Sequence, residues 1–298
     1  MFEQILFPTD GSDGAAFAFD HVVDLVDGHD ATVHILNVAD TTEHGILQMR
    51  GDDIDTLEQE GDRIVTEAAN RAHQRGIDTV TEVRQGEPYH EIVDYAETHG
   101  FDLVVMPTHG RRGLERFLLG STCERVVRRA DVPVLTIRPD DDVRVTHPYR
   151  NVLVPTDGSD CANQALALGA DVADSEDAVL HLLSVIAIAA LGADVRPDIR
   201  MGMLEENAHE LLDEAAAFAE NAGIETASTT VEYTPSIHEA ILTYIDDYDI
   251  DLVVVGTHGR TGFSRYVLGS VTEYLVRTSP IPVLTVRAPE GDTKDVSG

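Results

Sequence analysis

Ile5-Leu-Phe-Pro-Thr-Asp-Gly-Ser-Asp13 recurs almost unchanged as Val152-Leu-Val-Pro-Thr-Asp-Gly-Ser-Asp160. Later in each half, Thr108-His-Gly-Arg-Arg-Gly-Leu-Glu-Arg-Phe-Leu-Leu-Gly-Ser121 corresponds to Thr257-His-Gly-Arg-Thr-Gly-Phe-Ser-Arg-Tyr-Val-Leu-Gly-Ser270. The period is about half the chain, far longer than the roughly 20 to 50 residues of stacked repeats. The sequence therefore predicts two whole domains, at residues 1–140 and 149–290, joined by a polar linker at 139–148.

Each half alternates short β-branched runs with longer amphipathic segments, which is typical of a parallel sheet covered by helices on both faces. The predicted strands of the two halves are 4–7, 32–38, 79–84, 103–106 and 134–137, then 152–154, 179–185, 227–232, 252–255 and 283–286. The predicted helices are 14–25, 54–75, 89–98 and 122–129, then 162–173, 203–221, 236–246 and 271–278. The predicted fold class is α/β, with two tandem open doubly wound five-stranded parallel sheets. Such sheets bind ligands beyond the carboxyl ends of their strands, where both repeated motifs lie.

The charge of the chain is strongly acidic. It has 54 acidic and 21 basic residues, a formal net charge of −33, and the excess is shared evenly by the two halves. Carboxylates in this number with almost no lysine are typical of adaptation to high salt, where screening relieves self-repulsion, and an ordinary acidic protein is the alternative. The charge disfavours nucleic acid as a partner.

Several classes of protein are disfavoured by what the sequence lacks. The only lysine is Lys294, so Walker, kinase and Schiff-base lysines are missing, and no Gly-x-Gly-x-x-Gly follows either first strand. Cys123 and Cys161 have no Cys-x-x-Cys partner, which argues against a disulfide or metal site. No apolar stretch reaches the roughly 20 residues of a membrane span, and the acidic N-terminus does not resemble a signal sequence. We therefore assign no catalytic residue, and expect no membrane insertion and a cytoplasmic location.

The glycine-spaced loops are predicted to hold phosphate. In the second half, Gly256 and Gly259 are followed after nine residues by Gly269 and Ser270, and glycines allow the backbone to approach an anion closely. Ser270-Val-Thr-Glu273 and Ser121-Thr-Cys-Glu124 match the capping box, which would place both serines at helix N-termini that attract anions. Loop shape and helix capping alone are the alternative interpretation.

Charged residues beside the loops each allow two interpretations. Asp10 and Asp157 follow the first strands, where they are candidates to hold Mg²⁺ against phosphates or serve only the turn. The loop arginines are candidate phosphate ligands or solvated side chains: Arg111, Arg112, Arg116, Arg260 and Arg265.

Gly256, Gly259, Gly269 and Ser270 match in full the motif of the nucleotide-binding members of the universal stress protein family, which the chain resembles over nearly its whole length. The resemblance implies the adenine nucleotide alpha hydrolase-like fold, with strand order 3-2-1-4-5. It also implies an intrachain pseudo-dimer in which strands 134–137 and 283–286 pair. The implied ligand is ATP or another adenine nucleotide, with or without Mg²⁺.

The same resemblance implies the nucleotide-binding residues. In the second half they are Pro155, Thr156, Asp157, Val185, Val255, Gly256, Gly259, Gly269, Ser270 and Val271. In the first half they are Pro8, Thr9, Asp10, Val38, Met106, Gly110, Gly120, Ser121 and Thr122. The first half departs from the motif at Pro107, which replaces the first glycine, lacks an N–H and has a fixed φ. We therefore predict that the second half is the tighter site.

The function predicted from these residues is that of an ATP-binding regulatory or stress-response protein with little or no turnover. Two alternatives stay open. One is a slow ATPase or self-phosphorylating enzyme that uses the same site. The other is a nucleotide-free adaptor that regulates a transporter or kinase. An unidentified regulatory protein is the expected partner, and the chain is free to form a further homodimer.

Overall fold

The computed structural model describes residues 2–27, 31–42, 51–110, 119–188, 197–224, 227–259 and 267–288. The strands of the first half are β1 (Gln4–Pro8), β2 (Thr32–Asp40), β3 (Thr79–Gly86), β4 (Leu103–Pro107) and β5 (Val134–Ile137). Those of the second are β6 (Asn151–Pro155), β7 (Val179–Ala187), β8 (Ala227–Thr234), β9 (Leu252–Gly256) and β10 (Val283–Val286). The helices are α1 (Asp13–Val26), α2 (Gly51–His73), α3 (Pro88–His99), α4 (Ser121–Arg129), α5 (Asp160–Glu176), α6 (Pro197–Asn221), α7 (Ile237–Asp247) and α8 (Ser270–Thr278).

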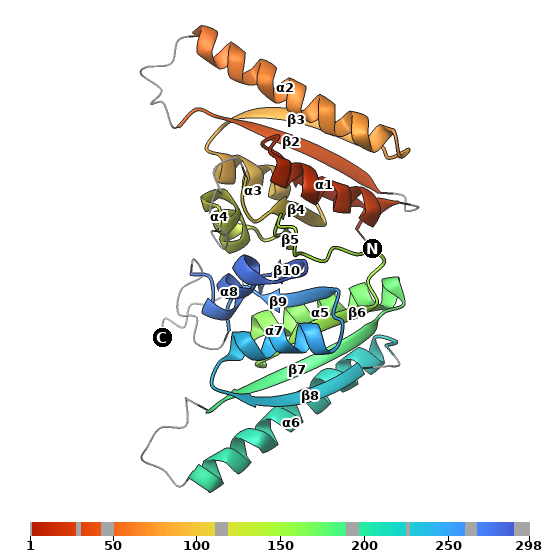
Figure 1. The fold of residues 1–298 in the computed structure, drawn as a ribbon, viewed down its shortest axis with the longest axis vertical. Helices are drawn as coiled ribbons and strands as arrows, with labels where there is room; N and C mark the ends of the chain where they lie inside the picture. Colours follow the sequence, from red (N-terminus) through yellow and green to blue (C-terminus); the bar gives the residue numbers. More distant parts are fainter. Residues whose placement is uncertain are drawn as a thin grey trace, which may run out of the picture.

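All ten strands form one sheet, in the order β3-β2-β1-β4-β5-β10-β9-β6-β7-β8. The expectation of two five-stranded sheets is therefore wrong. Each half does have the strand order 3-2-1-4-5, and the pairing of strands 134–137 and 283–286 that the family resemblance implies is confirmed. The sheets merge because β5 pairs with β10 in antiparallel register, whereas the other neighbouring strands are parallel. Figure 1 shows this junction at the centre of the molecule, with α2 and α6 at its two far ends.

The β5–β10 junction is symmetric in its side-chain bonds. The Thr136 hydroxyl donates to the carbonyl of Val283, and the Thr285 hydroxyl donates to the carbonyl of Val134, each at 3.1 Å. All four residues are nearly fully buried. Because each buried threonine hydroxyl has an acceptor on the opposite half, the strand pair carries no desolvation penalty at these positions.

Helices cover both faces of the sheet. One hydrophobic core lies between the sheet and α1, α2, α5 and α6, and it is continuous across the two halves. The opposite face has a core under α3 and α4 and another under α7 and α8. Neighbouring residues of one strand alternate between the faces, as Leu6 does between Ile5 and Phe7, because strand side chains have a period of two.

Strands extend further than the sequence pattern predicts. Both β2 and β7 continue two residues beyond the predicted ends, because their parallel pairing with β3 and β8 persists as far as Asp40 and Ala187. Helix α6 begins at Pro197, six residues before its predicted start. Proline suits the first turn of a helix, where its missing N–H has no intrahelical acceptor.

The linker packs along the second half. The Arg144 N–H donates to the carbonyl of Pro280 at 2.7 Å, and the Thr146 hydroxyl donates to Asp251 at 3.1 Å.

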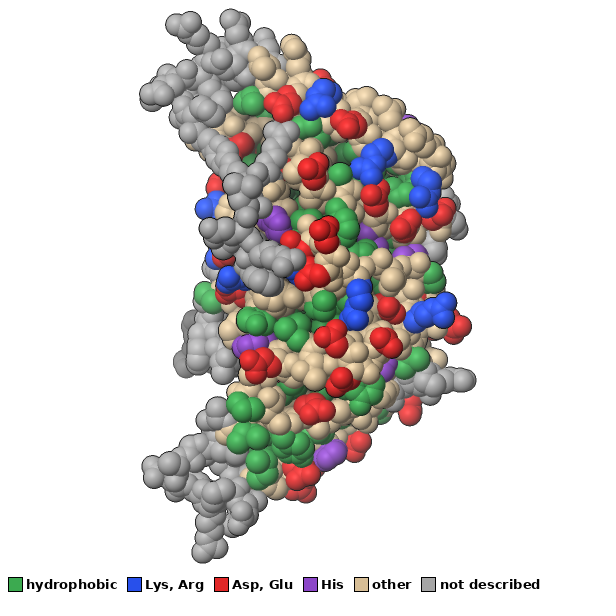
Figure 2. Space-filling model, viewed as in Figure 1, with side chains coloured by type: hydrophobic (Ala, Val, Ile, Leu, Met, Phe, Trp, Pro, Cys, Tyr) green, Lys and Arg blue, Asp and Glu red, His purple; other side chains and the backbone are tan. Residues whose placement is uncertain are grey.

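Cys123 and Cys161 are buried free thiols. Of the helices in the described ranges, none combines the length and the apolar character needed to cross a membrane. The space-filling view shows acidic side chains scattered over both halves, with few basic ones among them (Figure 2).

Candidate functional site

The turn after β1 is built from its own side chains. The Ser12 N–H donates to Asp10 Oδ1 at 3.0 Å, and the Gly11 N–H donates to the Thr9 hydroxyl at 3.1 Å. Gly11 has φ +72°, a conformation that glycine adopts without strain. Ser12 then caps α1 by accepting from the Ala15 N–H at 3.1 Å. The turn role that the sequence allowed for Asp10 is thus observed.

The turn after β6 has the same bonds. The Ser159 N–H donates to Asp157 Oδ1 at 3.0 Å, the Gly158 N–H donates to the Thr156 hydroxyl at 3.2 Å, and Ser159 caps α5. In both turns one carboxylate oxygen is held by the backbone. The other oxygen, Oδ2, points toward the glycine loop that follows β4 or β9.

The second glycine of each loop lies against this aspartate. A Cβ added at Gly110 would lie 2.1 Å from Asp10 Oδ2, and one at Gly259 would lie 2.5 Å from Asp157 Oδ2. Real Cβ atoms do not approach an oxygen this closely, so any side chain would displace the carboxylate. The two repeated motifs therefore meet in space, and glycine leaves room there for the aspartate side chain.

The third glycine closes the loop onto the strand end. The Gly120 N–H donates to the carbonyl of Thr108, and the Gly269 N–H donates to the carbonyl of Thr257, each at 2.8 Å. A Cβ at Gly269 would lie 3.2 Å from the Thr257 carbonyl oxygen and from the Cα of His258. Each glycine then leads directly into α4 or α8.

The predicted capping boxes are wrong. Gly120 and Gly269 are the N-cap residues of α4 and α8, and neither helix has a side-chain cap hydrogen bond. Ser121 and Ser270 are the first helical residues and are exposed. The pattern misled because glycine also serves as N-cap when its backbone is extended. Neither serine hydroxyl is therefore used in capping. Each lies beside the N–H groups of a helix N-terminus.

The first glycine has a packing role that the sequence did not reveal. A Cβ at Gly256 would lie 2.7 to 2.9 Å from the Cβ, C and O atoms of Cys161 in α5, so the residue permits close contact between strand and helix. Thr272 in α8 also donates to the Gly256 carbonyl at 2.7 Å. In the first half, Pro107 replaces this glycine, and Gly14 replaces the cysteine. The expected effect of Pro107 on ligand approach stays a prediction.

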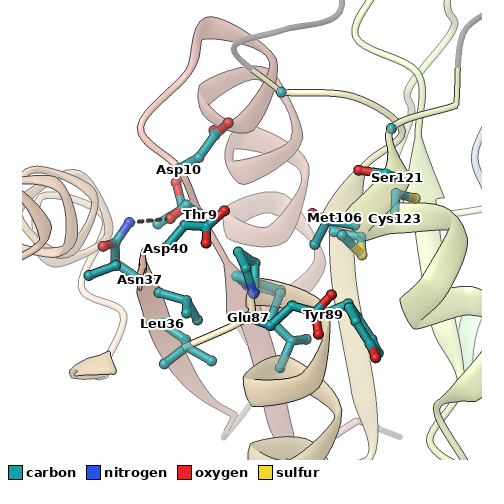
Figure 3. Close-up of a pocket in the computed structure, with 18 of the residues that line it drawn as sticks. Thr9, Asp10, Leu36, Asn37, Asp40, Glu87, Tyr89, Met106, Ser121 and Cys123 are labelled. Atoms are coloured by element: carbon teal, nitrogen blue, oxygen red, sulfur yellow. Dashed lines mark hydrogen bonds between the residues drawn. The ribbon is translucent and has the colours of Figure 1, made fainter. Parts of the chain in front are cut away.

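A pocket of about 1210 Å³ opens at this edge of the first half. The nine predicted residues of that half all line it, together with Pro107. Figure 3 shows Thr9 and Asp10 on one side and Met106, Ser121 and Cys123 across the pocket. The pocket is large enough for a small-molecule ligand, since such sites commonly measure about 300 to 1,000 Å³.

Sequence reasoning missed several residues of this pocket. Buried Asn37 donates to the carbonyl of Thr9 at 2.7 Å and so fixes the end of β1 (Figure 3). Arg125 donates to Glu87 at 2.5 Å and lies over the ring of Tyr89, 4.8 Å from its centroid. Glu87 and Tyr89 follow β3 directly, so their position after a predicted strand was the available signal. Arg125 lies within α4, outside the two repeated motifs.

The predicted residues of the second half lie at the corresponding edge. They stand in or after the carboxyl-terminal parts of β6, β7 and β9 and at the start of α8. Val255 is buried in the core under α7 and α8, and Val185 and Val271 pack against that core. These three side chains therefore belong to one apolar cluster at this sheet edge.

His258 is held inside the second half. Its Nε2 lies 3.4 Å from the Cys161 sulfur and its Nδ1 lies 3.1 Å from the Thr257 hydroxyl. Burial lowers the pKa of His258, and the nearby Arg287 cation lowers it further. The imidazole is therefore neutral at pH 7 and offers no cation to a phosphate group.

Two predicted features gain no support. The loop arginines Arg111, Arg112, Arg116, Arg260 and Arg265 lie outside the described residues. Among the described residues, no group of three or more His, Cys, Asp or Glu side chains is arranged to hold a metal ion. Asp10 and Asp157 each bind a backbone N–H, which is a sufficient structural role.

Comparisons with known proteins agree on the family. The universal stress protein family model matches residues 1–138 and 148–287. A universal stress protein of Methanocaldococcus jannaschii is 36% identical over 141 residues, which cover 46% of this chain and 83% of that protein. A universal stress protein from Archaeoglobus fulgidus has a similar structure, with a TM-score of 0.73 at 24% identity over 96% of this chain and 98% of that one. A universal stress protein solved in complex with cAMP is 24% identical, with a TM-score of 0.39, over 47% of this chain and 99% of that one.

Proposed function

The chain belongs to the universal stress protein family, and from that premise we propose that it binds an adenine nucleotide, with ATP as the main candidate, in each half. We further propose that it acts as a regulatory stress-response protein with little or no catalytic turnover. The nucleotide-binding residues proposed are those at the two sheet edges described above.

The contact between aspartate and glycine carries this proposal. In both halves an aspartate after the first strand touches a glycine of the loop, and the loop leads into a helix whose first residue is an exposed serine. A carboxylate can accept from ribose hydroxyls or a base amino group. Free helix N–H groups and a serine hydroxyl donate to phosphate oxygens. The two ends of a nucleotide thus have matching partners at one sheet edge.

The glycines of the two loops fit an anionic ligand better than they fit a metal ion held by the protein. Side chains at Gly110, Gly120, Gly259 or Gly269 would all meet protein atoms within 3.2 Å, so glycine allows these loop ends to pack closely against the aspartate and the strand end. No metal ion forms part of the proposal, because the described residues contain no group of three or more His, Cys, Asp or Glu side chains arranged to hold one.

Mass spectrometry of the gently purified full chain tests whether adenine nucleotide remains bound. Titration calorimetry then compares ATP binding by the wild type with the Gly259→Ala and Gly110→Ala variants. Loss of a hydrogen bond to a charged group costs about 1.5 to 3 kcal/mol, so each variant is expected to weaken one site by about 10- to 150-fold. Gly202→Ala is the control, because a Cβ there meets nothing within 4 Å. Absence of any nucleotide binding would favour the adaptor alternative.

Steady phosphate release tests for turnover. We expect the wild type to release phosphate from ATP no faster than a variant that carries both Gly259→Ala and Ser270→Ala. The reason is that the chain has a single lysine and that, at the described second-half edge, the histidine pKa is lowered by burial. Release well above the double variant would instead support a slow ATPase.

A further inference from the structure

The two halves of the chain place different charges at equivalent pocket positions. Strands β2 and β7 each have nine residues, and Asp40 ends the first where Ala187 ends the second. Asp40 is half-buried and lines the first-half pocket, and its Oδ1 accepts from the Thr42 N–H and hydroxyl. The second half has no carboxylate at the matching place.

A second difference lies on the helix that follows. Ala72 in α2 and Ala219 in α6 are both fully buried and occupy equivalent places in the common core. Counting back twelve residues from each aligns Glu60 with Asn207. Glu60 is half-buried and lines the first-half pocket. A carboxylate in the first half is thus again replaced by a neutral side chain in the second.

The other charged residues of the pocket do not change this difference. Asp10 corresponds to Asp157, so both halves share that charge. Glu87 and Arg125 form an ion pair in the first half, and their counterparts at the α7 N-cap and the fifth residue of α8 are the neutral Ser236 and Tyr274. Among the described residues, the first-half pocket therefore has two more net negative charges than the same positions of the second half.

From this difference we infer that the first-half pocket selects a nucleoside or a singly charged nucleotide in preference to ATP, and that Asp40 and Glu60 are the residues that set this specificity. The inference rests on the proposed function and narrows it for the first half, while ATP stays the main candidate for the second half. Carboxylates that line a partly enclosed pocket repel a polyphosphate more strongly than they do in bulk water. An uncharged nucleoside experiences no such repulsion, so its binding is unaffected by the two side chains.

The decisive experiment exchanges the charges between the halves. In the Gly259→Ala background, which is expected to weaken the second site, Asp40→Ala with Glu60→Asn introduces the residues that the second half carries. Calorimetry with EDTA present, so that ATP keeps its full charge, should show ATP affinity raised by about tenfold and adenosine affinity changed by less than about twofold. The reverse exchange, Ala187→Asp with Asn207→Glu in the Gly110→Ala background, should weaken ATP binding in the second half by a similar factor.

The control is Asp62→Asn, which removes one charge from an exposed position of the same helix outside the pocket. It should leave both affinities unchanged. If Gly259→Ala fails to fold, Gly269→Ala closes the same loop less severely. An unchanged ratio of ATP to adenosine affinity after the exchange would overturn the inference alone. No binding of either ligand in any background would overturn the proposed function together with it.

Discussion

Two glycines of the same motif, Gly256 and Gly259, have different physical roles. Gly259 touches a carboxylate tip that can move, whereas Gly256 touches the backbone and Cβ of Cys161 in a helix that cannot easily move. The sequence predicted that glycine was needed at both positions. It did not predict why, because the neighbouring atom lies about 100 residues away in the chain. The N-cap of α8 is mispredicted for a different reason. The sequence does not show that the extended backbone of Gly269, rather than Ser270, begins the helix.

The packing role of Gly256 predicts that Gly256→Ala destabilises the fold. Its Cβ would lie within 2.9 Å of backbone atoms of Cys161, and such overpacking costs about 1 to 3 kcal/mol. Denaturant unfolding measures the change. Gly202→Ala, in an open helical position, should instead be neutral or slightly stabilising. Equal stability of the two variants would contradict this account.

A buried histidine joins the first half to the start of the second half. His21 Nε2 lies 2.7 Å from the Tyr149 hydroxyl, and His147 binds Glu176 at 3.2 Å beside them. Burial lowers the pKa of His21, the nearby His147 adds to the shift and Glu176 partly opposes it, so that the pKa is about 3. In the unfolded chain His21 titrates at its ordinary value of 6.5. The equivalent residue of α5 is Leu168, so the sequence repeat gave no signal for this contact.

This histidine predicts a specific loss of stability in acid. Between pH 6.5 and about 3 the unfolded chain binds a proton at His21 that the folded protein does not. Stability is therefore complete above pH 6.5 and falls below it, by about 2 kcal/mol on reaching pH 5. Urea unfolding at pH 7.5 and pH 5 should show that this part of the loss disappears in His21→Leu, whatever the variant's stability at pH 7.5. Identical losses in the two proteins would exclude His21 as the cause.

The loop that leads into each helix of the site also links the two halves. Leu268, next to Gly269, is only 8% exposed and packs in the first-half core with Cys123 and Val126 of α4. Leu119, next to Gly120, packs against the cores of both halves. The sequence predicted the helices α4 and α8 well from their periodicity. It could not show that the residue before each one packs across the junction, since periodicity reports only which residues of one element share a face.

Removal of this crossing side chain should destabilise the molecule. Leu268→Ala leaves a cavity in a buried core, which typically costs about 2 to 5 kcal/mol. Val267→Ala is a matched control on the adjacent residue, because Val267 is 61% exposed and its truncation should change stability by less than about 0.5 kcal/mol. Denaturant unfolding compares the two. Similar effects would mean that Leu268 does not contribute to the junction as its burial indicates.

At the scale of the whole molecule, the element order followed from the residues, whereas the strand order of each half and the pairing of β5 with β10 followed only from the family resemblance. The apolar runs of β5 and β10, Val-Leu-Thr-Ile and Val-Leu-Thr-Val, indicate buried strands and do not specify a partner. Buried Arg138 strengthens the junction by binding the Ser279 carbonyl at 3.3 Å and Asp140 at 2.6 Å. Arg287, the equivalent residue of the second half, likewise donates to the carbonyl of Arg129 at 2.6 Å. The repeat shows both arginines, but it does not reveal that each has an acceptor in the opposite half.

The net charge of −33 predicts that the stability of the whole molecule depends on salt. Acidic side chains are spread over both halves, so folding brings like charges together without enough cations to offset them (Figure 2). Raising KCl from 0.1 M to molar concentration shortens the screening length from about 10 Å to about 3 Å and relieves this repulsion. The midpoint temperature of thermal unfolding should therefore rise by about 10 °C or more over that range. A stabilisation of a few kcal/mol shifts the midpoint of a protein this large by several degrees. Sucrose stabilises proteins because it is excluded from their surface, and it does not screen charge. It should therefore not reproduce the increase in midpoint temperature that the first additions of KCl produce. A flat KCl series would show that the repulsion is too weak to matter and that the acidity has another cause.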